Sequence, residues 1–202
     1  MPWADRVIIR PEVGSTAHGT GLPGGEDYDE MGVVLERWES TVGLFADPDN
    51  IVYRPGRSIN QRSEPGDNDL VLYTPRKFAR LAVSGNPSVL MMLFGPLRFS
   101  TPLGDRLRDL APAFWSGRAR ARFLGYSRAQ RERLLGMRGG AHTDRPELVA
   151  EFGYDTKYAM HMVRLGVQGI EYASTGGSPC RSQSPAARSC ATCGSASTHA
   201  IT

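Results

Sequence analysis

Short apolar runs in the first half of the chain predict β-strands. Residues 7–13 carry Val or Ile at four positions, with Pro11 implying either an edge strand or a bulge. A second apolar run ends at Leu35 and begins near two aspartates, and a third, DLVLY, covers residues 69–73. Between them, residues 51–53 are the best site for a further short strand.

Helix signals follow the third strand. The Thr-Pro pair at 74–75 combines an N-cap with a first-turn proline and predicts a helix over residues 76–83. Gly85 ends that helix, and the Asn-Pro pair at 86–87 predicts a second one over residues 88–94.

From Thr101 onward the pattern is helical. We expect Leu103, Leu107 and Leu110 to form one apolar stripe. Apolar contacts in the next segment are expected from Phe123, Tyr126, Leu134 and Leu135. A last strong helix is predicted from about Tyr154 to Tyr172.

The elements together predict an α+β fold, with a small mixed β-sheet covered by helices and followed by a helical C-terminal half. We expect residues 1–100 to form the core and residues 101–176 to pack on it. Residues 177–202 form a low-complexity tail.

The stretch from Gly14 to Leu35 carries candidate chemistry. Asp27 and Asp29 precede the second apolar run, and alternate residues of a strand share a face. Two carboxylates on one face repel unless a cation lies between them, and hard oxygen ligands suit Mg²⁺. Gly14, followed by Ser15, lets the backbone approach a ligand closely, and the next amides can receive phosphate oxygens. Glu30 is expected on the opposite face, in solvent.

Composition sets the broad class. The 202 residues, 40% hydrophobic and 22% charged, are typical of a soluble globular protein. We find no apolar run of membrane-spanning length and no signal-peptide pattern at the N-terminus, so we expect a cytoplasmic protein without membrane contact.

One segment is strongly basic although the net charge is only +3. It contains Arg118, Arg120, Arg122, Arg128, Arg131 and Arg133. Two interpretations stay open: a solvated helix face, or a basic wall beside a polyphosphate or RNA.

The three cysteines, Cys180, Cys190 and Cys193, all lie in the tail. Zinc needs four ligands and only His199 is close in sequence, so we expect no functional cysteine site. The tail from Ser178 has no core-forming pattern. It is either a native disordered tail or the product of a shifted reading frame.

Four blocks of the sequence carry a family resemblance, and they span roughly residues 7 to 176. They read GSTAHGTGLPGGEDYDEMGV, DNDLVLYTPRKFARLAVSGNPSVLMMLF, FLGYSRAQRERL and KYAMHMVRLGVQGIEY. In this order they resemble the DNA polymerase β-like nucleotidyltransferase superfamily, in its bacterial and phage, RNA-ligase-associated branch. The resemblance implies Mg²⁺-dependent transfer of an NMP from an NTP, ATP included, to a hydroxyl group.

The resemblance also implies a third carboxylate on a later strand. Asp69 is the best match, and Asp67, two residues earlier, is the alternative. Asp27 and Asp29 would then hold two Mg²⁺ ions, with Mn²⁺ as the alternative metal, and Asp69 would hold one of them. Ser15 and its neighbouring amides would orient the β- and γ-phosphates.

Lys157, His161 and Arg164 fall within a narrow arc of the last helix, whose other positions are largely apolar. Such a stripe faces solvent or a polar cleft, and the resemblance implies contact with the nucleotide. His161 is not expected to bind metal, because it has no ligand set around it.

The sequence leaves the acceptor open between RNA or tRNA and protein, and it does not indicate the oligomeric state. Two other functions also stay open. The chain could be a catalytically inactive nucleotide-binding or regulatory module, or a toxin–antitoxin-type enzyme that modifies a partner.

Overall fold

The computed structural model describes residues 3–17, 28–44, 47–55, 68–114, 116–137 and 146–174. Within them, five strands form one mixed sheet in the order β3-β4-β2-β1-β5. The strands are β1 (Val7–Val13), β2 (Tyr28–Val34), β3 (Asn50–Tyr53), β4 (Asn68–Tyr73) and β5 (Leu97–Ser100). β2 and β4 run parallel, while the other neighbouring pairs are antiparallel.

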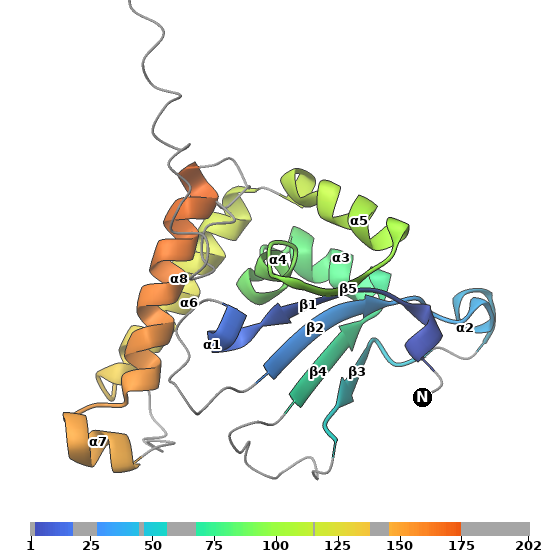
Figure 1. The fold of residues 1–202 in the computed structure, drawn as a ribbon. Helices are drawn as coiled ribbons and strands as arrows, with labels where there is room; N and C mark the ends of the chain where they lie inside the picture. Colours follow the sequence, from blue (N-terminus) through green and yellow to red (C-terminus); the bar gives the residue numbers. More distant parts are fainter. Residues whose placement is uncertain are drawn as a thin grey trace, which may run out of the picture.

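Helices complete the expected α+β fold (Figure 1). They are α1 (Gly14–Ala17), α2 (Trp38–Val42), α3 (Pro75–Val83), α4 (Pro87–Met92), α5 (Pro102–Asp109), α6 (Gly117–Leu134), α7 (Pro146–Phe152) and α8 (Thr156–Ser174), with short 3₁₀ turns at Ala4–Arg6 and Ala111–Phe114. In Figure 1, α3 and α4 lie over one face of the sheet, and α6 and α8 stand side by side near the end of β1 where α1 begins.

The predicted capping of α3 and α4 is confirmed. The backbone N–H of Lys77 donates to Thr74 Oγ1 at 3.3 Å, and that of Val89 donates to Asn86 Oδ1 at 3.3 Å. Gly85, with φ of +77°, turns the chain between the two helices.

Of the two structures predicted for Pro11, an edge strand or a bulge, the bulge is confirmed. β1 lies between β2 and β5, so Pro11 is not on an edge strand. The register between β1 and β5 shifts between Arg10 and Pro11, which accommodates a residue that has no N–H to donate.

The expected apolar stripe of α5 is wrong at two of its three positions. Leu103 and Leu110 are 46% and 55% exposed, and Leu107 alone packs against the core. The reason is that Thr101 Oγ1 donates to the carbonyl of Ile8 at 3.0 Å, and Gly104 lies directly against the same carbonyl. This contact turns the small Gly104, rather than the two leucines, toward the sheet.

The main hydrophobic core joins one sheet face to the helices. From the sheet it takes Ile9 and Val33, and from the helices it takes Phe78, Leu90, Met92, Phe123 and Tyr172. The Phe123 and Tyr172 rings stack with centroids 5.6 Å apart, which ties α6 to α8. A smaller cluster on the other face contains Val7, Val34, Leu70 and Leu72.

The opposite sheet face also carries charge. Glu30 lies there as expected, but the expectation that it is solvated is wrong: Arg10 Nε lies 2.6 Å from Glu30 Oε2, and the Glu30 side chain is 22% exposed. None of the helices in the described ranges is both long and apolar enough to cross a membrane.

The core predicts a contrast between two neighbouring residues. Phe123 is 2% exposed and Leu124 is 52% exposed. Phe123→Ala removes the stacked ring and leaves a cavity, so we expect the free energy of unfolding to fall by about 3–5 kcal/mol. Urea denaturation measures this loss. Leu124→Ala is the control and should change stability by less than about 1 kcal/mol; equal losses would contradict the packing described here.

Candidate active site

The turn after β1 brings the backbone against a carboxylate. Gly14 has φ of +86°, and a Cβ added there would lie 2.7 Å from Asp29 Oδ2 and 3.1 Å from Asp29 Cβ. Both the dihedral angle and the space therefore require glycine. The backbone at Gly14 thus lies close to the Asp29 carboxylate, and the expected close approach of a ligand to Gly14 stays a prediction. Ser15 belongs to α1, and its side chain lies outside the described part of the structure.

Two of the predicted carboxylates lie side by side. Asp29 and Asp69 are directly paired in the parallel ladder of β2 and β4, and Val13 pairs with Asp29 from the other side. Residues opposite one another on neighbouring strands point to the same face of a sheet, so both carboxylates emerge on the helix-covered face. Asp27 and Asp67 lie outside the described residues.

Arginines lie near both carboxylates. Arg54 Nε lies 3.3 Å from Asp69 Oδ2, and the two side chains are 35% and 19% exposed. Burial lowers the pKa of Arg164, and the charge of Asp29 partly opposes this shift. The carboxylate pair is thus partly balanced by cations from β3's end and from α8.

A cavity of about 390 Å³ opens beside Asp29. Its walls come from the β1–α1 turn, β2, the start of α4 and one face of α8. The lining residues are Val13, Gly14, Asp29, Met31, Pro87, Ser88, Met91, Lys157, Met160, His161, Arg164, Leu165 and Gln168. The predicted stripe of Lys157, His161 and Arg164 therefore faces this cavity, whose other walls are largely apolar. Asp69 is not among the described residues that line this cavity.

His161 and Arg164 contact each other within the cavity wall. Arg164 Nη2 lies 3.0 Å from His161 Nδ1. Because a guanidinium can only donate hydrogen bonds, His161 Nδ1 accepts, and the ring is neutral with its proton on Nε2. Arg164 Nε is buried and has no hydrogen-bond partner in the described part of the chain. The cavity thus presents donors suited to an anionic ligand.

Sequence reasoning missed two residues near this site. Gln168 is buried and lines the cavity, and its position four residues after Arg164 continues the same helical stripe, so the spacing could have found it. Arg54 carries no local signal, because only the pairing of β3 with β4 brings it to Asp69.

The carboxylate pair suits a hard metal ion, although the described ranges contain no cluster of three or more His, Cys, Asp or Glu arranged to hold one. Asp29 and Asp69 supply oxygen ligands on one sheet face, which is the donor type that Mg²⁺ prefers. Asp27, the predicted partner of Asp29 in the metal pair, belongs to the segment that the structure does not describe.

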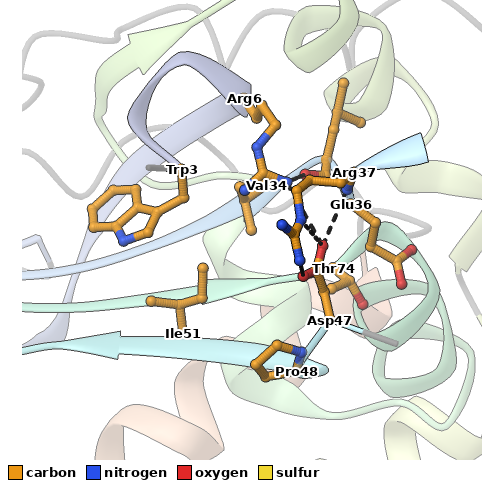
Figure 2. Close-up of a pocket in the computed structure, with 10 residues that line it drawn as sticks. Trp3, Arg6, Val34, Glu36, Arg37, Asp47, Pro48, Ile51 and Thr74 are labelled. Carbon is orange, nitrogen blue, oxygen red and sulfur yellow. Dashed lines mark hydrogen bonds and ion pairs between the residues drawn. The ribbon is translucent and has the colours of Figure 1, made fainter. Parts of the chain in front are cut away.

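A second cavity, of about 270 Å³, lies at the opposite end of β2 (Figure 2). Trp3, Ile51 and Pro48 supply apolar walls, and Figure 2 shows Arg6 and Arg37 turned toward Asp47. Arg37 Nη2 lies 2.8 Å from Asp47 Oδ1, and Arg6 Nη1 donates to the carbonyl of Leu35 at 2.8 Å. Its arginines are thus already paired within the chain, so we place the candidate active site at the first cavity.

Comparisons with known proteins identify a family. The model of the family described as RNA repair pathway DNA polymerase beta family (RlaP) matches residues 4–192. Among solved structures, a nucleotidyltransferase-like protein from Exiguobacterium sibiricum 255-15 is similar at 12% identity and a TM-score of 0.37, over 86% of this chain. The chain spans about half of that protein, 52% of its length. No curated protein matches.

The Gly14 turn predicts a specific sensitivity. Gly14→Ala places a Cβ against the Asp29 carboxylate, at a φ that L-residues disfavour. The substitution should displace that carboxylate. Because small displacements of active-site groups reduce rates strongly, we expect transfer activity to fall at least about tenfold. Activity assays and thermal unfolding measure the two effects. Gly166→Ala is the control, since no atom lies within 4 Å of its added Cβ, and it should raise stability by up to about 1 kcal/mol. Full activity of Gly14→Ala would refute the predicted sensitivity.

The second cavity predicts a pH dependence of stability. Hydrogen bonds from the Arg37 side chain and backbone hold the pKa of Asp47 at about 2. A carboxyl group with a depressed folded-state pKa stabilises above its ordinary pKa, and this contribution is lost as the pH falls toward 2. The urea midpoint of the wild type should therefore be higher than that of Asp47→Asn at neutral pH. This difference in midpoint should disappear as the pH falls to the pKa of Asp47. A difference that is constant over this range would exclude the titration of Asp47 as its cause.

Proposed function

The chain belongs to the RNA repair pathway DNA polymerase beta family, and from this premise we propose that it is a metal-dependent nucleotidyltransferase that moves an NMP from an NTP to a hydroxyl group. One observation carries the proposal. The Gly14 turn, Asp29 and Asp69 adjoin on one sheet face, and the cavity beside Asp29 is walled by Lys157, His161 and Arg164. Carboxylates beside an anion-binding wall suit a metal-bound polyphosphate.

The α8 side chains are assigned to the triphosphate. Lys157 and Arg164 offer positive charge, and the buried Arg164 Nε offers a donor that no described residue uses. His161, neutral and held by Arg164, would donate through Nε2 to a phosphate or sugar oxygen. Ser15 and the amides after Gly14 would orient the β- and γ-phosphates.

The carboxylates are assigned to Mg²⁺, with Mn²⁺ as the alternative metal. Asp29 and Asp69 would hold the metal with Asp27, and Asp67 is the alternative to Asp69. Such ions, two in the mechanism expected for this superfamily, neutralise phosphate charge and lower the pKa of the attacking hydroxyl. Arg54 would balance the Asp69 charge while no metal is present, because its Nε lies 3.3 Å from Asp69 Oδ2.

The family description, which names an RNA repair pathway, supports a proposal for the acceptor class. We therefore favour RNA or tRNA over protein. Incubation with each α-labelled NTP, Mg²⁺, total tRNA and lysate, followed by identification of the labelled macromolecule, tests this choice. Label on protein would support the partner-modifying alternative. Metal-dependent NTP binding without any transfer would support the inactive regulatory module.

Substitution of the paired carboxylates tests the chemistry. Asp29→Asn or Asp69→Asn removes a metal ligand and relieves repulsion between like charges, so transfer should fall by about three orders of magnitude while the fold persists. Transfer of labelled NMP and the thermal midpoint are the measurements.

Glu30→Gln is the matched control, because Glu30 follows Asp29 on the same strand but points to the opposite face, where it pairs with Arg10. It should keep activity within a few-fold of wild type. Unchanged transfer in both aspartate variants would end the nucleotidyltransferase proposal.

A further inference from the structure

The outward surface of α6 is strongly basic. The helix carries Arg118, Arg120, Arg122, Arg128, Arg131 and Arg133, and all six are exposed. The only acidic residue in its sequence is Glu132. The positive excess of this one helix is larger than the net charge of +3 of the whole chain.

Among the residues that the structure describes, no carboxylate pairs with these arginines. Elsewhere, Arg10, Arg54 and Arg98 each pair with a carboxylate, at 2.6, 3.3 and 2.8 Å. Across the described ranges, none of the six α6 arginines forms an ion pair. A concentrated positive field therefore faces solvent along this helix.

Helix stability accounts for only part of this arrangement, because only Arg131 and Arg133 lie in the last turn of α6, where the helix dipole favours basic side chains. Arg118 and Arg120 lie in the first turn of α6, where the helix dipole favours acidic side chains. Arg118 and Arg122 are also spaced to face each other with like charge. The arginines at the start of α6 thus disfavour their own helix, as is typical of residues that serve a binding function.

The shape of the surface indicates the ligand. Arg122, Tyr126 and Arg133 line a hollow of about 570 Å³, and the small residues Ala121, Gly125 and Ala129 lie between them. Tyr126 is 38% exposed. Guanidinium groups fit phosphates bidentately, and an exposed aromatic ring can stack on a base. A membrane-binding helix would instead place bulky apolar side chains among its cations.

We propose that the α6 face formed by Arg118, Arg122, Tyr126 and Arg133 binds single-stranded RNA. Arg133 lies over the Tyr158 ring, with its guanidinium carbon 5.9 Å from the centroid. Tyr158 directly follows Lys157, which lines the candidate active-site cavity. The basic face thus contacts α8, the helix that also supplies Lys157 to the cavity wall. Its assignment as the acceptor-binding surface of the enzyme rests on the proposed function.

Binding of a fluorescein-labelled single-stranded RNA to the full chain, without nucleotide or metal, tests the inference. Because no turnover occurs under these conditions, the assay measures RNA binding independently of catalysis. RNA binding would therefore support the inference even if the protein transferred no nucleotide. The double variant Arg122→Gln/Arg133→Gln should weaken binding about tenfold at physiological salt. The slope of log K against log salt should fall by about 1.4, or about 0.7 for each lost phosphate contact.

Arg120→Gln/Arg131→Gln is the matched control. It removes the same charge from the side of α6 about 160° away at 100° per residue, and it should weaken binding less than about threefold. Tyr126→Ala should also weaken binding, whereas Tyr126→Phe should preserve it by keeping the stacking ring. Equal losses in the two arginine doubles, no RNA binding by wild type, or binding of anionic vesicles in place of RNA would each overturn the inference.

Discussion

The close approach of the Asp29 carboxylate to the backbone at Gly14 is the constraint on which the candidate site depends. An added Cβ at Gly14 would lie 2.7 Å from Asp29 Oδ2, so the turn can hold no other residue in this conformation. The antiparallel pairing of β1 with β2 sets that approach, and the parallel pairing of β2 with β4 adds Asp69 on the same face. The strand order therefore assembles the carboxylates.

The same geometry creates an electrostatic cost that the rest of the fold reduces. Two carboxylates side by side repel, and the fold sets Arg54 against Asp69 and the charge of Arg164 near Asp29. On the opposite sheet face, Arg10 and Arg98 pair with Glu30 and Glu12. Carboxylates on both sheet faces thus have cationic partners, whereas the described residues provide no ion pair to the arginines of α6.

Helix α8 serves the core and the site with different faces. Tyr172 is buried against Phe123 of α6, and Leu165 joins the same core. Lys157, His161 and Arg164 line the cavity on the neighbouring arc. Because packing fixes the rotation of the helix, the position of the cationic stripe depends on apolar contacts that are remote from it. This coupling explains why a helix with few polar residues can still present an ordered set of donors.

The sequence by itself determined most of the elements around the site, since these have local causes. Apolar runs predicted β1 to β4, and Thr74 and Asn86 predicted the starts of α3 and α4. The periodicity of α8 also predicted that its cations share an arc. β5 was missed because its Leu97 and Phe99 remain 41% and 42% exposed, so it carries no buried pattern.

Only the tertiary structure decided which faces meet. The pairing of Asp29 with Asp69, the contact of Arg54 with Asp69 and the approach of α8 to the turn at Gly14 all join residues distant along the chain. The exposure of Leu103 and Leu110 was likewise decided by the packing of Gly104 on Ile8. Periodicity encodes that a side chain belongs to a face, but the partner of that face is set by long-range packing and hydrogen bonding.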